Sequence, residues 1–117
     1  MDIPLRELRG VTVLAHLNAE NRHDIAATLA TFRPGFERTE MPGDDVADGR
    51  AAVADSYREL FTAFPDMHFD IAPDSFGHQG NRVIFETVVR GTHRGPFRGL
   101  PPTGRRLNLP IVTVFEF

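Results

Sequence analysis

The stretch Gly91–Gly104, GTHRGPFRGLPPTG, contains four glycines and three prolines in fourteen residues. Apolar runs typical of strands flank it, at residues 83–89 and 107–115. Glycine permits backbone angles that other residues avoid, whereas proline fixes φ and removes a hydrogen-bond donor. The pattern therefore predicts two long strands joined by a loop of defined shape, and such a loop can roof the mouth of a pocket.

The first half of the chain has apolar residues at helical spacing. A first helix of about four turns is predicted from the spacing of Leu5, Leu8, Val11, Leu14, Ala15 and Leu17. A second helix is expected to begin at Asn21 as N-cap, with Asp24 in the capping-box position, and to end before Pro34. A third helix, opened by Asp48-Gly49 and stopped by Pro65, is predicted from the apolar stripe of Val53, Tyr57, Leu60, Phe61 and Phe64.

The second half changes to the period of two that is typical of strands. Met67, Phe69 and Ile71 alternate with polar residues, and residues 77–81 indicate a turn. One face of the next strand carries Val83, Phe85, Thr87 and Val89. One face of the last strand carries Leu107, Leu109, Ile111, Thr113, Phe115 and Phe117. Helices followed by antiparallel strands predict an α+β domain with its helices on one face of a curved sheet.

Composition narrows the class of protein. A chain of 117 residues is expected to form one domain. The absence of Cys excludes disulfides and Cys-ligated zinc, and a net charge of −3 gives no electrostatic reason to expect a nucleic acid or an anionic membrane as partner. The N-terminus lacks the form of a signal peptide, so a cytoplasmic location is expected. All basic residues are Arg, which indicates the coding bias of a GC-rich bacterium.

Three stretches carry a resemblance to a known family: LNAEN at residues 17–21, FPDMHF at residues 64–69, and GTHRG at residues 91–95 with GLPPTG at residues 99–104. Over roughly residues 14–117 the chain resembles the SnoaL-like polyketide cyclases of the nuclear transport factor two-like superfamily. The resemblance implies a single domain over residues 1–117 with a cone-shaped α+β barrel, in which a strongly curved antiparallel sheet wraps three N-terminal helices around an apolar cavity. It also implies a homodimer formed through the sheets.

The resemblance also bears on chemistry. In the cyclases an Asp acts as general acid/base for an intramolecular aldol closure, and the corresponding position would lie beyond Phe117. The family's helper positions fall near Thr113 and Ile111. The chain is therefore expected to lack the family's C-terminal strand, and the apolar edge at Phe115 and Phe117 is expected to be covered by further chain or by a second subunit.

Acid/base chemistry on this fold needs a carboxylate or an imidazole in an apolar pocket, because burial moves a carboxyl pKa toward neutrality. The candidates for catalysis are His93, His16 and Thr113. Each has an alternative: His93 holds the loop in shape, His16 is an ordinary helix histidine, and Thr113 bonds a nearby carbonyl. The residues predicted to line the pocket are Phe32, Tyr57, Phe61, Phe85, Thr87, Ile111 and Thr113.

Neither a metal nor a cofactor is expected. The acidic stretch at residues 44–49, with Asp55, does not match the ligand pattern of a calcium-binding loop. No two of the five His stand at i and i+4 with a carboxylate between them, which would be a metal-ligand pattern. The loop at residues 91–104 has no Lys and matches no dinucleotide or phosphate pattern.

Two functions from different classes remain open. The first is an aldol cyclase, isomerase or hydrolase that binds a small apolar, carbonyl-bearing molecule and uses cofactor-free acid/base chemistry. The alternative is a non-catalytic ligand-binding or dimerisation module on the same fold. A buried carboxylate or imidazole in a pocket would favour the enzyme, whereas an interior filled by Phe side chains would favour the module.

Overall fold

The computed structural model describes residues 3–41, 43 and 45–117. Its helices are α1 (Leu5–Asn21), α2 (Ile25–Leu29) and α3 (Arg50–Ala63). Its strands are β1 (Arg38–Met41), β2 (Asp45–Asp48), β3 (His68–Ile71), β4 (Gly77–Gln79), β5 (Arg82–Thr92) and β6 (Arg106–Glu116). The predicted α+β class is confirmed, with three helices before the main antiparallel sheet.

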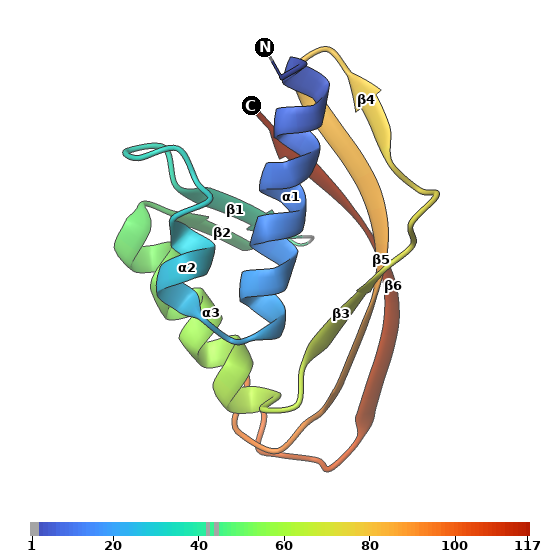
Figure 1. The fold of residues 1–117 in the computed structure, drawn as a ribbon. Helices are drawn as coiled ribbons and strands as arrows, with labels where there is room; N and C mark the ends of the chain where they lie inside the picture. Colours follow the sequence, from blue (N-terminus) through green and yellow to red (C-terminus); the bar gives the residue numbers. More distant parts are fainter. Residues whose placement is uncertain (1–2, 42, 44) are drawn as a thin grey trace.

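The main sheet is built around β5. β6 pairs with β5 along its whole length, and β3 and β4 share the other side of β5, where each covers one part of it. β5 and β6 bend around the helices, with α1 lying along the concave side (Figure 1). β1 and β2 form a separate antiparallel hairpin that contacts α3. β6 is therefore an edge strand within the described residues.

Two apolar clusters fill the concave side of the sheet. The first joins α2 and α3 to the sheet, with buried members Leu29, Val53, Ala54, Tyr57, Phe61, Met67 and Val89. The second joins α1 to the sheet, with buried members Val13, Leu17, Val83 and Phe85. The strand β5 contributes to both clusters because its buried residues alternate with exposed ones, as the period of two predicts.

The loop at residues 91–104 has a defined shape and is held against the end of α3. Its Arg94 N–H donates to the carbonyl of Ala63 over 2.8 Å, which satisfies one of the open carbonyls at the helix terminus. At its tip, Phe97 and Leu100 exchange two backbone hydrogen bonds around Arg98 and Gly99, which have φ of 52° and 79°. Positive φ at both central residues is the mark of a type I′ turn.

The predicted start of the second helix was wrong. Asn21 is the last residue of α1, and Asp24 is the N-cap of α2, since its carboxylate accepts from the Ala27 N–H. The predicted opening of the third helix is confirmed, because Asp48 ends β2 and Gly49, with a φ of 95°, is the N-cap of α3. The predicted first helix is confirmed as well, but Leu5, Leu8 and Val11 are exposed on it.

Candidate active site

The buried face of α1 carries two titratable side chains. Four buried residues recur at i, i+3, i+4 and i+7, the spacing that keeps residues on one side of a helix: Val13, His16, Leu17 and Glu20. Val13 and Leu17 pack on the sheet, so His16 and Glu20 are carried into the same interior, where they are 5% and 7% exposed. A buried ionisable pair on an apolar face costs free energy and marks a candidate functional site.

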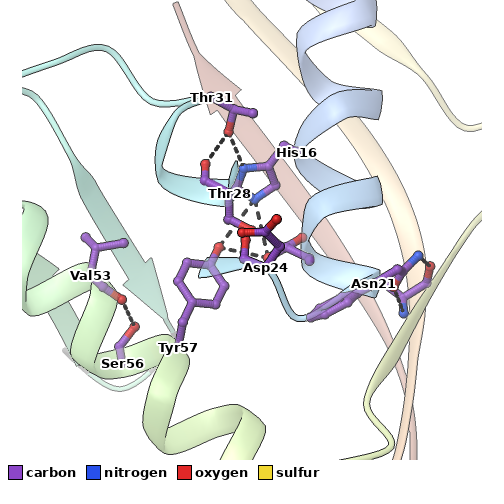
Figure 2. A network of polar contacts seen from close by, with 10 residues as sticks. His16, Asn21, Asp24, Thr28, Thr31, Val53, Ser56 and Tyr57 are labelled. Atoms are coloured by element: carbon purple, nitrogen blue, oxygen red, sulfur yellow. Dashed lines mark hydrogen bonds and ion pairs between the residues drawn. The ribbon is translucent and has the colours of Figure 1, made fainter. Parts of the chain in front are cut away.

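Tyr57 of α3 completes the group from the opposite side. Its hydroxyl donates to Glu20 Oε2 over 2.8 Å and lies 3.3 Å from His16 Nε2. His16 Nε2 is also 3.3 Å from Glu20 Oε2. Tyr57 on α3 points toward His16 on α1, and Thr31, in the turn that follows α2, lies on the other side of the His16 ring (Figure 2). We refer to His16, Glu20 and Tyr57 as the buried triad.

The hydrogens of the triad can be assigned from its contacts. Thr31 Oγ1 donates its hydrogen to the Thr28 carbonyl over 2.6 Å, so it accepts from His16 Nδ1 at 2.8 Å. Tyr57 has one hydroxyl hydrogen, and the shorter contact gives it to Glu20. His16 Nε2 and Glu20 Oε2 therefore face each other at 3.3 Å, within ion-pair distance. At that distance the imidazole and the carboxylate are placed to act as an acid/base pair.

The surroundings of the triad are largely aromatic. The rings of Phe32 and Phe115 meet the His16 ring edge-on, with centroids 5.5 Å and 4.8 Å away. Burial, reinforced by the Glu20 carboxylate, raises the pKa of Tyr57 well above its usual value. The phenol therefore stays protonated at physiological pH and serves as a hydrogen-bond donor.

The structure separates the three catalytic candidates. His16 belongs to the triad. His93 is buried at the other end of β5, where its Nδ1 accepts from the Thr103 N–H over 3.3 Å and its ring stacks on Phe64. This contact joins the two ends of the loop, as the alternative interpretation of His93 expects. Thr113 is half-buried on β6, paired in register with Phe85.

The residues predicted to line a pocket all lie on the inner side, but they differ in burial. Phe85 is 1% exposed and is part of the second apolar cluster, and Phe61 is buried in the first. Phe32, Ile111 and Thr113 are only half-buried. The hydroxyl of Thr87 is buried and has no hydrogen-bond partner among the described residues.

Two hollows lie on the surface of the described residues. One of about 340 Å³ lies between exposed residues of α3 and the loop, and is lined by Arg58, Glu59, Thr62, Pro96, Arg98 and Gly99. The other, of about 220 Å³, lies on the sheet and is lined by Ala72, Glu86, Thr87, Val88, Pro110, Ile111 and Val112. Neither lining includes a member of the triad. The loop thus borders a hollow on the outer side of α3.

Within residues 3–41, 43 and 45–117, no three His, Asp or Glu side chains are grouped closely enough to hold a metal ion. The helices of this same part of the chain are too short or too polar to cross a membrane.

Sequence reasoning missed Glu20 and Thr31. The signal for Glu20 was present, because a His and a carboxylate at i, i+4 are neighbours on a helix surface. Thr31 gave no such signal, since its contact with His16 depends on how the turn after α2 folds back on α1.

Comparison with known proteins places the chain in a family. The model of the SnoaL-like polyketide cyclases matches residues 11–117. The chain belongs to this family. The resemblance noted in the sequence is therefore confirmed, and with it the family's cone-type α+β fold.

Solved structures agree with the family assignment. A candidate SnoaL-like polyketide cyclase from Jannaschia sp. CCS1 superposes with a TM-score of 0.80 at 24% identity, over 100% of this chain and 82% of that one. A candidate polyketide cyclase from Xanthomonas campestris pv. campestris gives 0.77 at 26% identity, over 92% and 78%. AclR, a candidate hydroxylase from Streptomyces galilaeus, gives 0.77 at 25% identity, over 95% and 68%. No curated protein matches the chain in sequence.

Proposed function

We propose that the protein binds a small apolar, carbonyl-bearing molecule on the concave side of the sheet and transfers a proton on it, as an aldol cyclase, isomerase or hydrolase. The observation that carries the proposal is the buried triad, in which a carboxylate, an imidazole and a phenol lie within 2.8–3.3 Å of one another. Burial of two titratable groups in an aromatic interior is costly for stability, which favours a functional reason for their presence.

The proposed chemistry uses the chain's own groups. His16 Nε2 and Glu20 Oε2 exchange a proton with the ligand, taking it from a carbon next to a carbonyl or giving it to a developing oxyanion. Tyr57, held neutral by its raised pKa, orients the carboxylate through its hydrogen bond. Each proton taken up at one step is returned at a later one, so the cycle needs no external oxidant or reductant.

The proposed route to the triad passes between α1 and β6. Phe115 contacts His16, and together with Ile111 and Thr113 it is half-buried on the inner side of β6. Phe32, on the other side of His16, is half-buried as well. A flat apolar ligand would displace or stack on these two rings, because aromatic side chains favour such contacts.

The alternative function, a non-catalytic binding or dimerisation module, is favoured by one observation. Phe85 and its neighbours fill the interior beneath α1, and the two surface hollows do not reach the triad. In that case the triad would act only as a polar bridge between α1 and α3.

A ligand panel distinguishes the two functions. We expect at least one compound among aromatic ketones, steroids, terpenoids and their epoxides to raise the thermal midpoint saturably and to be converted to an isomeric or hydrated product. Stabilisation should follow mass action as the compound concentration rises above its Kd. Saturable binding without conversion would favour the module, and no thermal shift across the panel would contradict ligand binding altogether.

We further propose a homodimer formed through the convex face of the sheet. This face exposes apolar side chains on both sides of Glu86, the cross-strand partner of Val112, and Val112 and Val114 are 64% and 50% exposed. The other apolar members of this face are Ile84, Val88 and Pro110. The ends carry the ion pairs Arg82–Glu116 and Arg90–Asp70, which are typical of a polar rim.

Replacing Val112 with Asp is expected to weaken this dimer by roughly 100-fold or more, because the new carboxylate would be desolvated in the interface. Val11 on α1 is 61% exposed and lies away from the sheet, so Val11→Asp introduces the same charge but should leave association unchanged. Sedimentation equilibrium over a concentration series measures both variants. A wild-type protein that stays monomeric throughout, or an equal effect of the two variants, would rule out this interface.

A further inference from the structure

We infer that Thr31 is a positioning residue that fixes the tautomer of His16, so that the neutral imidazole carries its hydrogen on Nδ1 and presents Nε2 to Glu20 and Tyr57. The catalytic meaning of this inference rests on the proposed function, but the tautomer itself is a property of the ligand-free protein. Thr31 is bonded to Nδ1 and not to Nε2 or Oε2, the atoms proposed to exchange a proton with the ligand.

The argument begins with the hydroxyl of Thr31. This group has one hydrogen and donates it to the Thr28 carbonyl over 2.6 Å. It can therefore meet His16 Nδ1, 2.8 Å away, only as an acceptor. The tautomer with hydrogen on Nε2 would place the lone pair of Nδ1 against the lone pairs of Thr31 Oγ1 and lose that hydrogen bond. In exchange, its Nε2 hydrogen would gain only the longer contact of 3.3 Å with Glu20 Oε2.

The Thr31 hydroxyl that accepts from His16 is itself held in place by the local backbone. Thr28 is fully buried, and its hydroxyl donates to the Asp24 carbonyl over 2.8 Å. The backbone N–H of Thr31 also donates to the Thr28 carbonyl, over 3.1 Å. The hydroxyl and the backbone N–H of Thr31 thus both donate to the Thr28 carbonyl oxygen. This fixes the rotation of the Thr31 side chain and directs a lone pair of Oγ1 toward His16 Nδ1.

The tautomer of His16 determines which imidazole nitrogen faces Glu20 and Tyr57. Once Nδ1 carries hydrogen, Nε2 is the only imidazole atom with a free lone pair, and it is 3.3 Å from both Glu20 Oε2 and Tyr57 Oη. A base must present the correct nitrogen to its partner, and which nitrogen is free depends on the hydrogen bond made by the other. Thr31 supplies that hydrogen bond here.

Two-bond ¹H–¹⁵N correlation spectra of the histidine rings test the inference directly. In wild-type protein without ligand, neutral His16 should appear as the Nδ1–H tautomer. Thr31→Val removes the acceptor at nearly constant volume and should lower the ratio of Nδ1–H to Nε2–H by about tenfold, the effect of one ordinary hydrogen bond. Thr31→Ser keeps the hydroxyl and should restore the wild-type ratio.

A matched control is available on α1. Thr12, one helical turn before His16, donates its hydroxyl to the Leu8 carbonyl and is hydrogen-bonded to no triad member among the described residues, so Thr12→Val should leave the tautomer ratio of His16 unchanged. With a converted substrate in hand, Thr31→Val should lower kcat with little change in KM, and Thr31→Ser should recover it.

The wild-type spectrum alone can overturn the inference. If neutral His16 carries its hydrogen on Nε2, or if Thr31→Val leaves the tautomer ratio at its wild-type value, Thr31 has no positioning role. Because the measurement needs no substrate, these outcomes are separate from the failure of the ligand panel, which would remove the proposed function and leave the tautomer as found. Should Thr31→Val not fold, the wild-type and Thr31→Ser spectra still decide the matter.

Discussion

Glu20→Gln should lower turnover by roughly 10²–10⁴-fold, the usual contribution of a general acid or base, while the protein stays folded. The amide keeps the size of the carboxylate and its oxygen can still accept from the Tyr57 hydroxyl, 2.8 Å away in the wild type. What is lost is the carboxylate that lies 3.3 Å from His16 Nε2 and is proposed to exchange a proton with the ligand. The measurement is kcat on a compound converted by the wild type, with circular dichroism as the check on folding.

Glu7→Gln is the control for this prediction. Glu7 lies on the same helix in the first turn of α1, is exposed and contacts no member of the triad. Removing its charge should leave kcat within the error of the wild type. A Glu20→Gln protein that retains full turnover would show that Glu20 is a structural bridge to Tyr57, and the proposed proton transfer would have to be abandoned.

The second large effect concerns stability. Gly95→Ala should lower the free energy of unfolding by about 1–3 kcal/mol, the usual cost of forcing extra volume into a packed site. A Cβ at Gly95 would lie 2.5 Å from the carbonyl oxygen of Thr62 and 3.3 Å from Ala63 Cα. Both are backbone atoms at the end of α3, so the loop would have to move and lose the hydrogen bonds to the Ala63 carbonyl. Urea unfolding monitored by circular dichroism gives the change.

Gly10→Ala provides a control of opposite sign. Gly10 lies inside α1, where a Cβ would have open space around it out to 4 Å. Alanine there should raise the free energy of unfolding by about 0.5–1 kcal/mol, because glycine loses more backbone freedom on folding. Destabilisation by both substitutions to the same extent would mean that close packing of the loop on α3 is not the cause.

Much of the sheet could be predicted because its signal is local. Val83, Phe85 and Thr87 alternate with exposed residues on β5, and a period of two can arise only from an extended chain with one buried face. The shaped loop was predictable for the same kind of reason, since its glycines and prolines act on their own φ angles. The hairpin of β1 and β2 was not predicted, because β2 has only four residues, begins and ends with Asp, and pairs with β1 alone among the described strands.

The buried face of α1 shows where local reasoning failed. Leu5, Leu8 and Val11 are spaced by three residues, so each step moves about 60° around the helix and Val11 ends on the side opposite Val13. These side chains are 45–61% exposed. The i, i+3, i+4, i+7 set that starts at Val13 stays on one face, and it includes His16 and Glu20. Their meeting with Tyr57 depends on the packing of α1 against α3, which no local pattern encodes.

The side chain of Asn21 has a consequence for the location of the chemistry. Its amide donates to the Phe69 carbonyl over 3.0 Å and accepts from the Phe69 N–H over 2.8 Å, so a side chain takes the place of a neighbouring peptide at the margin of β3. Glu20 precedes Asn21 in the same helix. These two hydrogen bonds fix the rotation of α1 relative to β3. A shift of the helix by a single residue would turn the Glu20 carboxylate by about 100° away from the Tyr57 hydroxyl. The Asn21 amide therefore helps to hold the carboxylate in position.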